Sequence, residues 1–379
     1  MRSSVLRPRT SRGPNTTRKL HVPATAAGES VLATAPCRAD LAGGTLDLWP
    51  LYLFHPGAVT VNFALNILTR CRITPQPGRA ICLKALDLGR QESFASLDKL
   101  GRARRYRHPL AALLVRHFRP QTGLLLETHS ASPAGAGISG SSALMVAVAA
   151  ALARFTGRKM DREALRQVAQ NVEAQVIGVP TGCQDYYPAL YGGVSAIWLE
   201  VEGVRHETLA VAPEEMDRRF LLAYTGAPRQ SGINNWEVFQ RHIGGDARVV
   251  RNFQSIAQIA QAMRQALVAS AWSEVARLLR EEWKLRRANY PGISTPLIDR
   301  LMAAARRHGA EAAKVCGAGG GGCVLFMAEP DARERVAQAL AAAGGTVLPM
   351  RVSRRGLTVA VRRGAALSPW SLESAGGRA

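Results

Sequence analysis

A run of glycine, alanine and serine at residues 132–142 constrains the fold of this chain more than any other segment. Residues 123–129 before it are typical of a strand, and small apolar residues follow it, so we expect a helix from about Ser141 to Phe155. Glycines allow a backbone to approach a phosphate closely, and the free N–H groups and dipole of a helix N-terminus favour an anion there. The hydroxyls of Ser141 and Ser142 could reach a phosphate oxygen or its magnesium ion. The run therefore predicts a site for a phosphorylated ligand.

Three other interpretations of this run are possible. A P-loop requires a lysine after the last glycine, and none follows Gly140. The letters Gly135-x-Gly137-x-x-Gly140 match the dinucleotide fingerprint, with Asp161 about twenty residues further on. However, residues 130–133 separate the strand from these glycines, and Asp161 is placed to begin a helix instead of ending a second strand. The last alternative is a tightly packed helix of small residues that binds no ligand.

Length and composition limit the class of protein. At 379 residues the chain exceeds the usual size of one hydrophobic core, which predicts two domains. The longest apolar run, residues 143–153, is too short to span a bilayer, and no signal-peptide pattern precedes it. Six cysteines without C-x-x-C spacing favour free thiols in a reducing compartment, so we expect a cytoplasmic protein.

The chain is strongly basic, with 49 Lys and Arg against 28 Asp and Glu and a net charge of +21. This charge favours anionic partners in general, including nucleotides, phosphosugars, nucleic acid and acidic lipid. Aromatic residues, which single-stranded nucleic-acid surfaces combine with basic ones, make up only 6%. We therefore expect a small-molecule partner and neither a nucleic acid nor a membrane. The basic stretch at 101–119 is typical of a solvated surface, or alternatively contacts an anionic group of the substrate.

Residue patterns divide the chain into four parts. Residues 1–29 form a basic tail that resembles a transit peptide in composition, but Pro8, Gly13 and Pro14 interrupt any amphipathic helix, so we interpret it as disordered. A polar segment at 203–215 separates a first domain, residues 30–205, from a second, residues 206–366, and residues 367–379 form a flexible tail. We expect further helices from Asp161 to near Gly178, at 246–268, 271–289 and 296–308, and from about 331. Expected strands lie at 31–37, 58–73, 193–199, 219–224, 323–327 and 346–351, with one more ending at Cys316.

Three motifs resemble, in order and spacing, those of the GHMP kinases (galactokinase, homoserine kinase, mevalonate kinase and phosphomevalonate kinase). They are Ala35-Pro-Cys-Arg-Ala-Asp-Leu-Ala-Gly-Gly-Thr-Leu-Asp47, Pro133-Ala-Gly-Ala-Gly-Ile-Ser-Gly-Ser-Ser-Ala143 and Lys314-Val-Cys-Gly-Ala-Gly-Gly-Gly-Gly-Cys323. The second differs from the usual form in Ile138 and in one extra residue. The resemblance covers about residues 30–360 and implies an α+β fold, with a ribosomal protein S5 domain 2-like N-terminal domain and a ferredoxin-like C-terminal domain.

The resemblance also implies an ATP site, a Mg²⁺ site and a catalytic pair. The residues that would bind ATP are Pro133, Gly135, Gly137, Ser139, Gly140, Ser141 and Ser142. Glu173 would hold Mg²⁺ together with Ser142 or Ser141, through oxygen ligands that suit a hard cation. Asp185 would be the general base for the attacking hydroxyl, and Arg38 beside it would keep this carboxylate ionised.

Each of these assignments has a structural alternative. Glu173 could be an ordinary exposed glutamate of a helix, Asp185 the first residue of an Asx-turn, and Arg38 part of a structural ion pair. Tyr186 also departs from the family pattern, because many relatives have Gln after the base.

The first motif has the form found in sugar kinases of this family, which implies a sugar as the phosphate acceptor. The residues that would contact it are Asp47, Gly43, Gly44, Thr45, Tyr224, Gly319 and Gly320. Tyr224-Thr-Gly-x-x-Arg-x-Ser231 resembles a segment of bacterial heptose-7-phosphate kinases. We therefore expect an ATP-dependent sugar kinase acting on the anomeric hydroxyl, with a phosphorylated sugar such as heptose 7-phosphate as one possible substrate. The alternatives are a sugar-sensing protein without turnover and a mevalonate-pathway kinase or decarboxylase, and the expected state is monomer or homodimer.

Overall fold

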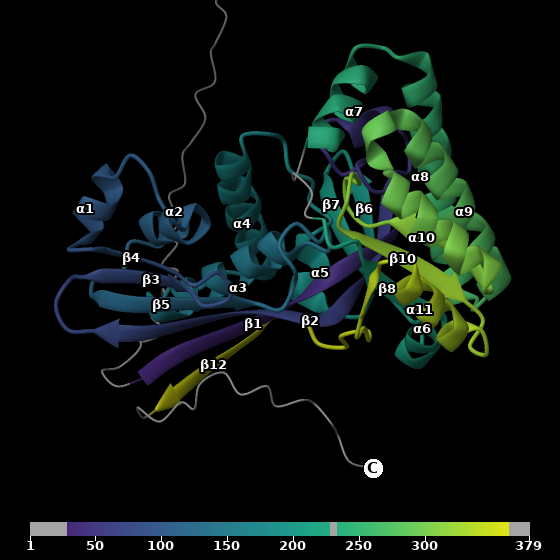
Figure 1. The fold of residues 1–379 in the computed structure, drawn as a ribbon. Helices are drawn as coiled ribbons and strands as arrows, with labels where there is room; N and C mark the ends of the chain where they lie inside the picture. Colours follow the sequence, from purple (N-terminus) through teal and green to yellow (C-terminus); the bar gives the residue numbers. More distant parts are fainter. Residues whose placement is uncertain (1–28, 228–232, 364–379) are drawn as a thin grey trace, which may run out of the picture.

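Two β-sheets organise this chain in a computed structural model that describes residues 29–227 and 233–363 (Figure 1). The predicted tails, apart from Glu29, lie outside the described residues, as do Arg229 and Ser231 of the heptose-kinase-like segment. None of the described helices combines the length and the apolar character needed to cross a membrane.

The larger sheet has eight strands in the order β12-β1-β2-β5-β3-β4, and β6 pairs with β2 and with β7. All pairs are antiparallel except β3 with β5. The strands are β1 (Glu29–Ala42), β2 (Val59–Gln76), β3 (Ile81–Ala85), β4 (Arg90–Phe94), β5 (Gly123–Ser130), β6 (Val194–Glu200), β7 (Gly203–Leu209) and β12 (Thr358–Arg363). β2 is long enough, at 18 residues, to pair with β6 near its start and with β5 near its end.

The smaller sheet has four antiparallel strands in the order β11-β8-β10-β9. They are β8 (Phe220–Tyr224), β9 (Ala310–Val315), β10 (Cys323–Ala328) and β11 (Thr346–Leu348). Helices separate β8 from β9 and β10 from β11, which gives the β-α-β-β-α-β succession of the ferredoxin-like motif. The α+β fold predicted from the sequence is confirmed.

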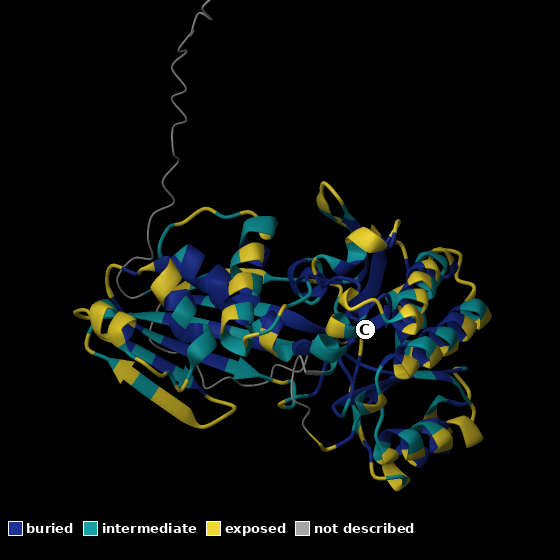
Figure 2. Ribbon diagram, turned by 90° about the horizontal axis from the view of Figure 1, so that it is seen from above, coloured by how far each residue is buried: buried dark blue, intermediate teal, exposed yellow. Residues whose placement is uncertain are grey.

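In Figure 1, most helices of the first half lie on one face of the larger sheet, and most helices of the second half lie around the smaller sheet. Figure 2 shows buried and exposed residues alternating along these helices. The helices of the first half are η1 (Leu51–Phe54), α1 (Leu97–Arg102), α2 (Pro109–Phe118), α3 (Gly140–Phe155), α4 (Arg162–Ile177) and α5 (Tyr186–Tyr191). Those of the second half are α6 (Pro213–Arg219), α7 (Ile233–Ile243), α8 (Ala247–Val268), α9 (Trp272–Asn289), η2 (Pro291–Ile293), α10 (Pro296–Arg307) and α11 (Arg333–Ala342). The paired helices α8 and α9 connect the halves, since α8 packs on β1 and β2 while α9 packs on β9.

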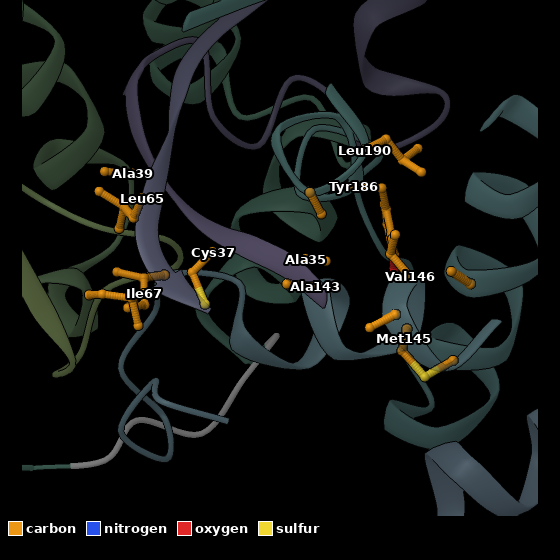
Figure 3. Close-up of a cluster of buried hydrophobic side chains, with 14 of the residues drawn as sticks. Ala35, Cys37, Ala39, Leu65, Ile67, Ala143, Met145, Val146, Tyr186 and Leu190 are labelled. Atoms are coloured by element: carbon orange, nitrogen blue, oxygen red, sulfur yellow. The ribbon is translucent and has the colours of Figure 1, made fainter. Parts of the chain in front are cut away.

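The buried face of α3 explains its unusual composition. Its alanines allow close packing against β1 and β2 on one side and against α2, α4 and α5 on the others. In Figure 3, Ala143, Met145 and Val146 of this helix lie in one cluster with Cys37 of β1 and Leu65 of β2. This packing fixes the position of the helix N-terminus.

Local signals for the helix ends agree with the structure. Asp161 caps α4, because its Oδ1 accepts a hydrogen bond from the N–H of Ala164 at 2.7 Å, and Gly178 ends this helix in the left-handed conformation. Thr295 caps α10 through the N–H of Ile298.

Strand pairing crosses the predicted domain boundary at residue 205. β7 extends to Leu209 and pairs with β6, and β12 returns from the end of the described chain to pair with β1. The division into domains stays a prediction, and both of these strands belong to the larger sheet.

Candidate active site

A cleft of about 590 Å³ opens at the N-terminus of α3. Residues 130–137 and 139–142 line one side, and residues from α4 and the segment before α5 line the other. All the residues predicted to bind ATP lie in this lining: Pro133, Gly135, Gly137, Ser139, Gly140, Ser141 and Ser142. Glu173 and Asp185 line the same cleft, so the structure brings the predicted nucleotide, metal and base residues together.

The start of α3 offers hydrogen-bond donors to the cleft. Ser139 precedes the helix with a φ of 61°, and its side chain does not cap the helix. Its buried Oγ has no hydrogen-bond partner within residues 29–227 and 233–363. Gly135 and Gly137 also have positive φ, at 67° and 76°, where a side chain would add strain. An unpaired buried hydroxyl beside the free N–H groups of a helix suits the oxygens of a phosphate chain.

Glu173 of α4 is buried at the edge of this cleft. Its Oε1 accepts a hydrogen bond from Ser141 Oγ, and its Oε2 accepts one from Tyr186 OH at 2.6 Å. Burial raises the pKa of Glu173, although the hydrogen bonds from Ser141 and Tyr186 partly offset this rise. Tyr186 thus holds the predicted metal ligand in place.

The donor set around Glu173 fits a hard divalent cation. It combines one carboxylate with the hydroxyls of Ser141 and Ser142, all oxygen donors. Among the residues that the structure describes, no group of three or more His, Cys, Asp or Glu side chains could hold a metal ion by itself. Phosphate oxygens or water would have to supply the remaining ligands, as is common for Mg²⁺.

Arg38 and Asp185 meet beside the cleft. Arg38 donates from Nε at 2.9 Å and from Nη2 at 2.6 Å, both to Asp185 Oδ1. Burial lowers the pKa of Arg38, but Asp185 and Asp40 raise it above its ordinary value, so the guanidinium stays charged. The Asp185 side chain is 26% exposed and caps no helix, so a substrate can reach this carboxylate.

Asp47 lies behind the cleft lining. It is buried, and it accepts hydrogen bonds from the backbone N of Gln184 at 2.9 Å and from Gln184 Nε2 at 3.1 Å. Burial raises its pKa to about 6, and the nearby Asp185 adds to this rise. Gly182 allows the approach, because a Cβ there would lie 2.0 Å from Asp47 Oδ2. Asp47 therefore fixes the loop that carries Asp185.

The other residues predicted to contact a sugar lie outside the cleft lining. A Cβ on Gly43 would lie 2.1 Å from Val59 O, and one on Gly44 would lie 2.5 Å from Arg286 Nη1. Thr45 donates from Oγ1 to Asn235 Oδ1 at 3.1 Å.

The remaining three residues predicted to contact a sugar also lie against other residues of this chain. Tyr224 OH donates to Ala134 O at 3.4 Å, in the first glycine-rich loop (residues 133–140). A Cβ on Gly319 would lie 2.4 Å from Ile293 O, and one on Gly320 would lie 2.9 Å from Asn234 Nδ2. Their role in binding a sugar stays a prediction.

Several residues near the site were not predicted. Asn235 of α7 lines the cleft, together with Ala318 of the third motif, and Gln184 holds Asp47. Asp40 and Lys314 were inside recognised motifs, but only the fold shows that their side chains meet at 2.7 Å. For Asn235 the sequence carries no local signal, because only the tertiary fold brings α7 to the cleft.

Comparison with known proteins agrees with this geometry. The family model of the GHMP kinases N terminal domain matches residues 105–193, and that of the GHMP kinases C terminal matches residues 263–346. The D-glycero-alpha-D-manno-heptose 7-phosphate kinase of Campylobacter jejuni is 24% identical over 340 residues, which cover 87% of this chain and 98% of that protein.

Two further relatives extend the comparison. A mevalonate kinase of Thermococcus onnurineus is 30% identical over 253 residues, 62% of this chain and 69% of that protein. The structure of Lactococcus lactis galactokinase complexed with galactose superimposes with a TM-score of 0.72 at 17% identity, covering 87% of this chain and 95% of that one. Fold, motifs and sequence similarity agree, and the chain belongs to the GHMP kinase family.

Proposed function

We propose that this chain transfers the γ-phosphate of ATP to a hydroxyl of a sugar. The observation that carries the proposal is the Arg38–Asp185 pair, which meets at the edge of a cleft lined by the N-terminus of α3. The similarity to a protein named as a heptose 7-phosphate kinase, and to a galactokinase in fold, supports a sugar as the acceptor.

The first glycine-rich loop would bind the triphosphate. Backbone N–H groups at the start of α3 and the Ser139 hydroxyl provide donors, and the positive end of the helix dipole favours the phosphate charge. Glu173 with Ser141 or Ser142 would hold Mg²⁺, which supplies neutralisation of charge on the phosphates when it is bound.

Asp185 would accept the proton of the attacking hydroxyl. The two hydrogen bonds from Arg38 orient the carboxylate toward the position that a general base would occupy. Arg38 would also place a positive charge near the transferred phosphoryl group, where it would stabilise developing negative charge. Positioning and charge stabilisation of this kind account for most phosphoryl-transfer catalysis.

The acceptor is the least defined part of the proposal. Attack by the anomeric hydroxyl is proposed by analogy with the sugar kinases of the family that the motifs resemble. The six arginines at 102–119 are all exposed and none lines the cleft, so a phosphorylated acceptor rests on the similarity to the heptose 7-phosphate kinase. Mevalonate is the second candidate acceptor, because a protein named mevalonate kinase is 30% identical. Cytoplasmic location and a monomeric or homodimeric state stay predictions.

The test is ADP release from Mg-ATP with a panel of free aldoses, phosphorylated aldoses including heptose 7-phosphate, and mevalonate. Wild-type protein is compared with Asp185→Asn, which keeps the shape of the side chain, and with Glu202→Gln as an exposed control. We expect sugar-dependent turnover that Asp185→Asn lowers by about 100-fold or more and that the control leaves unchanged. Turnover with mevalonate and with none of the sugars would show that the acceptor is mevalonate and not a sugar. Saturable sugar binding without turnover in any protein would favour a sensor instead of an enzyme.

A further inference from the structure

Five charged side chains are buried together where the two sheets meet, outside the cleft lining. They are Arg38 and Asp40 of β1, Glu282 and Arg286 of α9, and Lys314 of β9. With Asp185 the cluster contains three acidic and three basic groups, so its formal charge is balanced. It joins the first motif to the second half of the chain.

Asp40 is the centre of this cluster. Its Oδ2 accepts a hydrogen bond from Lys314 Nζ at 2.7 Å, and its Oδ1 accepts one from Arg38 Nη1 at 3.3 Å. The same Oδ1 accepts a hydrogen bond at 3.1 Å from the backbone N of Gly317, the first residue of the second glycine-rich loop (residues 317–322). Burial raises the pKa of Asp40, but Lys314, Arg38 and Arg286 lower it below its ordinary value, so the carboxylate stays ionised.

Lys314 and Arg286 complete the connection to the second half. Lys314 is fully buried, and its Nζ also donates to Leu41 O at 3.3 Å and to Glu282 Oε1 at 3.2 Å. Arg286 donates from Nη2 to Gly317 O at 2.6 Å. Gly317 is therefore held through both its N–H and its carbonyl.

The orientation of Arg38 depends on Asp40. Two donors of Arg38 contact Asp185, while Nη1 contacts Asp40 and the carbonyl of Gly137 at 3.1 Å. Asp40 thus fixes one end of the guanidinium, and Asp185 meets the other. Without Asp40, only Gly137 O would restrain Nη1.

Stability alone is a poor reason for such a cluster. Burying paired charges costs desolvation that their attraction often fails to offset, and apolar residues of similar volume are frequently at least as stable. An ion-pair cluster that touches the predicted catalytic pair is better explained by the geometry it imposes.

We propose that Asp40 and Lys314 are positioning residues for the phosphoryl-transfer site. They hold Arg38 against Asp185 and couple this pair to the second glycine-rich loop, so that the site is complete only when both halves are in contact. This inference rests on the proposed function, since it concerns the same reaction.

The test compares Asp40→Asn, Lys314→Met and the double variant Asp40→Asn/Lys314→Met with wild-type protein, using the acceptor that turns over in the panel. The exposed pair of Arg205 and Glu200, 2.8 Å apart, gives the control variant Glu200→Gln. We expect Asp40→Asn to lower kcat by about 100-fold, as a displaced catalytic group does, with KM for ATP changed by less than about twofold. Thermal unfolding is measured for each variant.

The double variant separates positioning from stability. The double variant removes both charges of the Asp40–Lys314 pair. We therefore expect its unfolding temperature to return toward the wild-type value while kcat stays low. Recovery of both quantities, or a kcat for Asp40→Asn within about twofold of wild type, would overturn the inference and leave the proposed function standing. If Asp40→Asn does not fold, the kcat and the unfolding temperature of the double variant test the inference. Wild-type protein without turnover would overturn the proposed function and this inference together.

Discussion

The two glycine-rich loops of this chain have similar compositions and opposite surroundings. Residues 133–140 line the cleft almost throughout, whereas Ala318 is the one residue of 317–322 that does so. The first loop ends at a buried hydroxyl without a hydrogen-bond partner in the described parts of the chain. The second loop is held by its own backbone, since Gly320 N donates to Ile293 O at 2.9 Å and Cys323 N donates to Ala136 O at 2.7 Å.

The difference shows that glycine serves two purposes in one fold. In the first loop, Gly135 and Gly137 adopt positive φ angles in the lining of the cleft. In the second loop, Gly319 and Gly322 lack a Cβ where backbone atoms already lie. Removal of the unpaired Ser139 hydroxyl in the first loop should therefore change kinetics, and a side chain added at Gly319 or Gly322 in the second loop should lower the free energy of unfolding.

The largest effect is expected for Gly322→Ala. Its φ is +77°, and a Cβ would lie 2.7 Å from Ala136 O, a backbone atom that cannot move aside. Strain and overpacking together should lower the free energy of unfolding by about 3 kcal/mol. Guanidinium denaturation measures this loss, and a change below about 1 kcal/mol would remove the distinction between the two loops.

Glu173→Gln should lower kcat by an amount nearly as large in free energy, without loss of stability. We expect kcat to fall by about 100-fold, or about 2.7 kcal/mol, because the neutral amide is a weaker ligand for the cation. Burial already raises the pKa of Glu173, so a neutral side chain should leave the unfolding temperature unchanged or higher. ADP release over a series of Mg²⁺ concentrations and thermal unfolding report the two quantities, and a variant that loses stability but keeps kcat would contradict this assignment.

A smaller effect of the same kind is expected for Ser139→Ala. Its Oγ has no partner among the described residues, so its removal should not destabilise the protein. Loss of one hydrogen bond to a phosphate should raise KM for ATP by about tenfold. Steady-state kinetics with varied ATP tests this, and an unchanged KM would mean that this hydroxyl does not contact the nucleotide.

The smallest effect is expected for Gly78→Ala, the matched control for Gly322→Ala. Its φ of +78° is nearly the same, but no atom lies within 4 Å of the added Cβ. Only the conformational strain remains, so the free energy of unfolding should fall by about 1 kcal/mol. If both variants lose the same amount in denaturation experiments, φ alone explains the glycine at 322.

The parts of the fold that could be predicted from the sequence are those whose signals are local. The glycines and serines before α3, the cap at Asp161 and the end of α4 at Gly178 are each set by residues close in sequence. Helix α2 was missed because its apolar face, including Leu114, Val115 and Phe118, lies within the basic stretch and was outweighed by the arginines.

The parts that could not be predicted depend on contacts distant in sequence. β4 is mostly polar and partly exposed, so it lacks the alternation that indicates a strand. The meeting of Asp40 with Lys314, 274 residues apart, requires the two sheets to be in place. The candidate site follows the same division. Its motifs contain the loop and the carboxylate that line the cleft, while the surroundings of Asp47 and the cleft position of Asn235 emerged only from the fold.

The pairing of β12 with β1 has a consequence for synthesis of the chain on the ribosome. β1 emerges first, and the strand that covers its edge, from Thr358 to Arg363, emerges after nearly all other described residues. Until then one edge of the larger sheet is open to mispairing with other chains. Glu29 and Arg363 are register partners. A circular permutant that joins these two residues through a short linker, and begins at the exposed turn at Gly78, would make β12 and β1 a local hairpin.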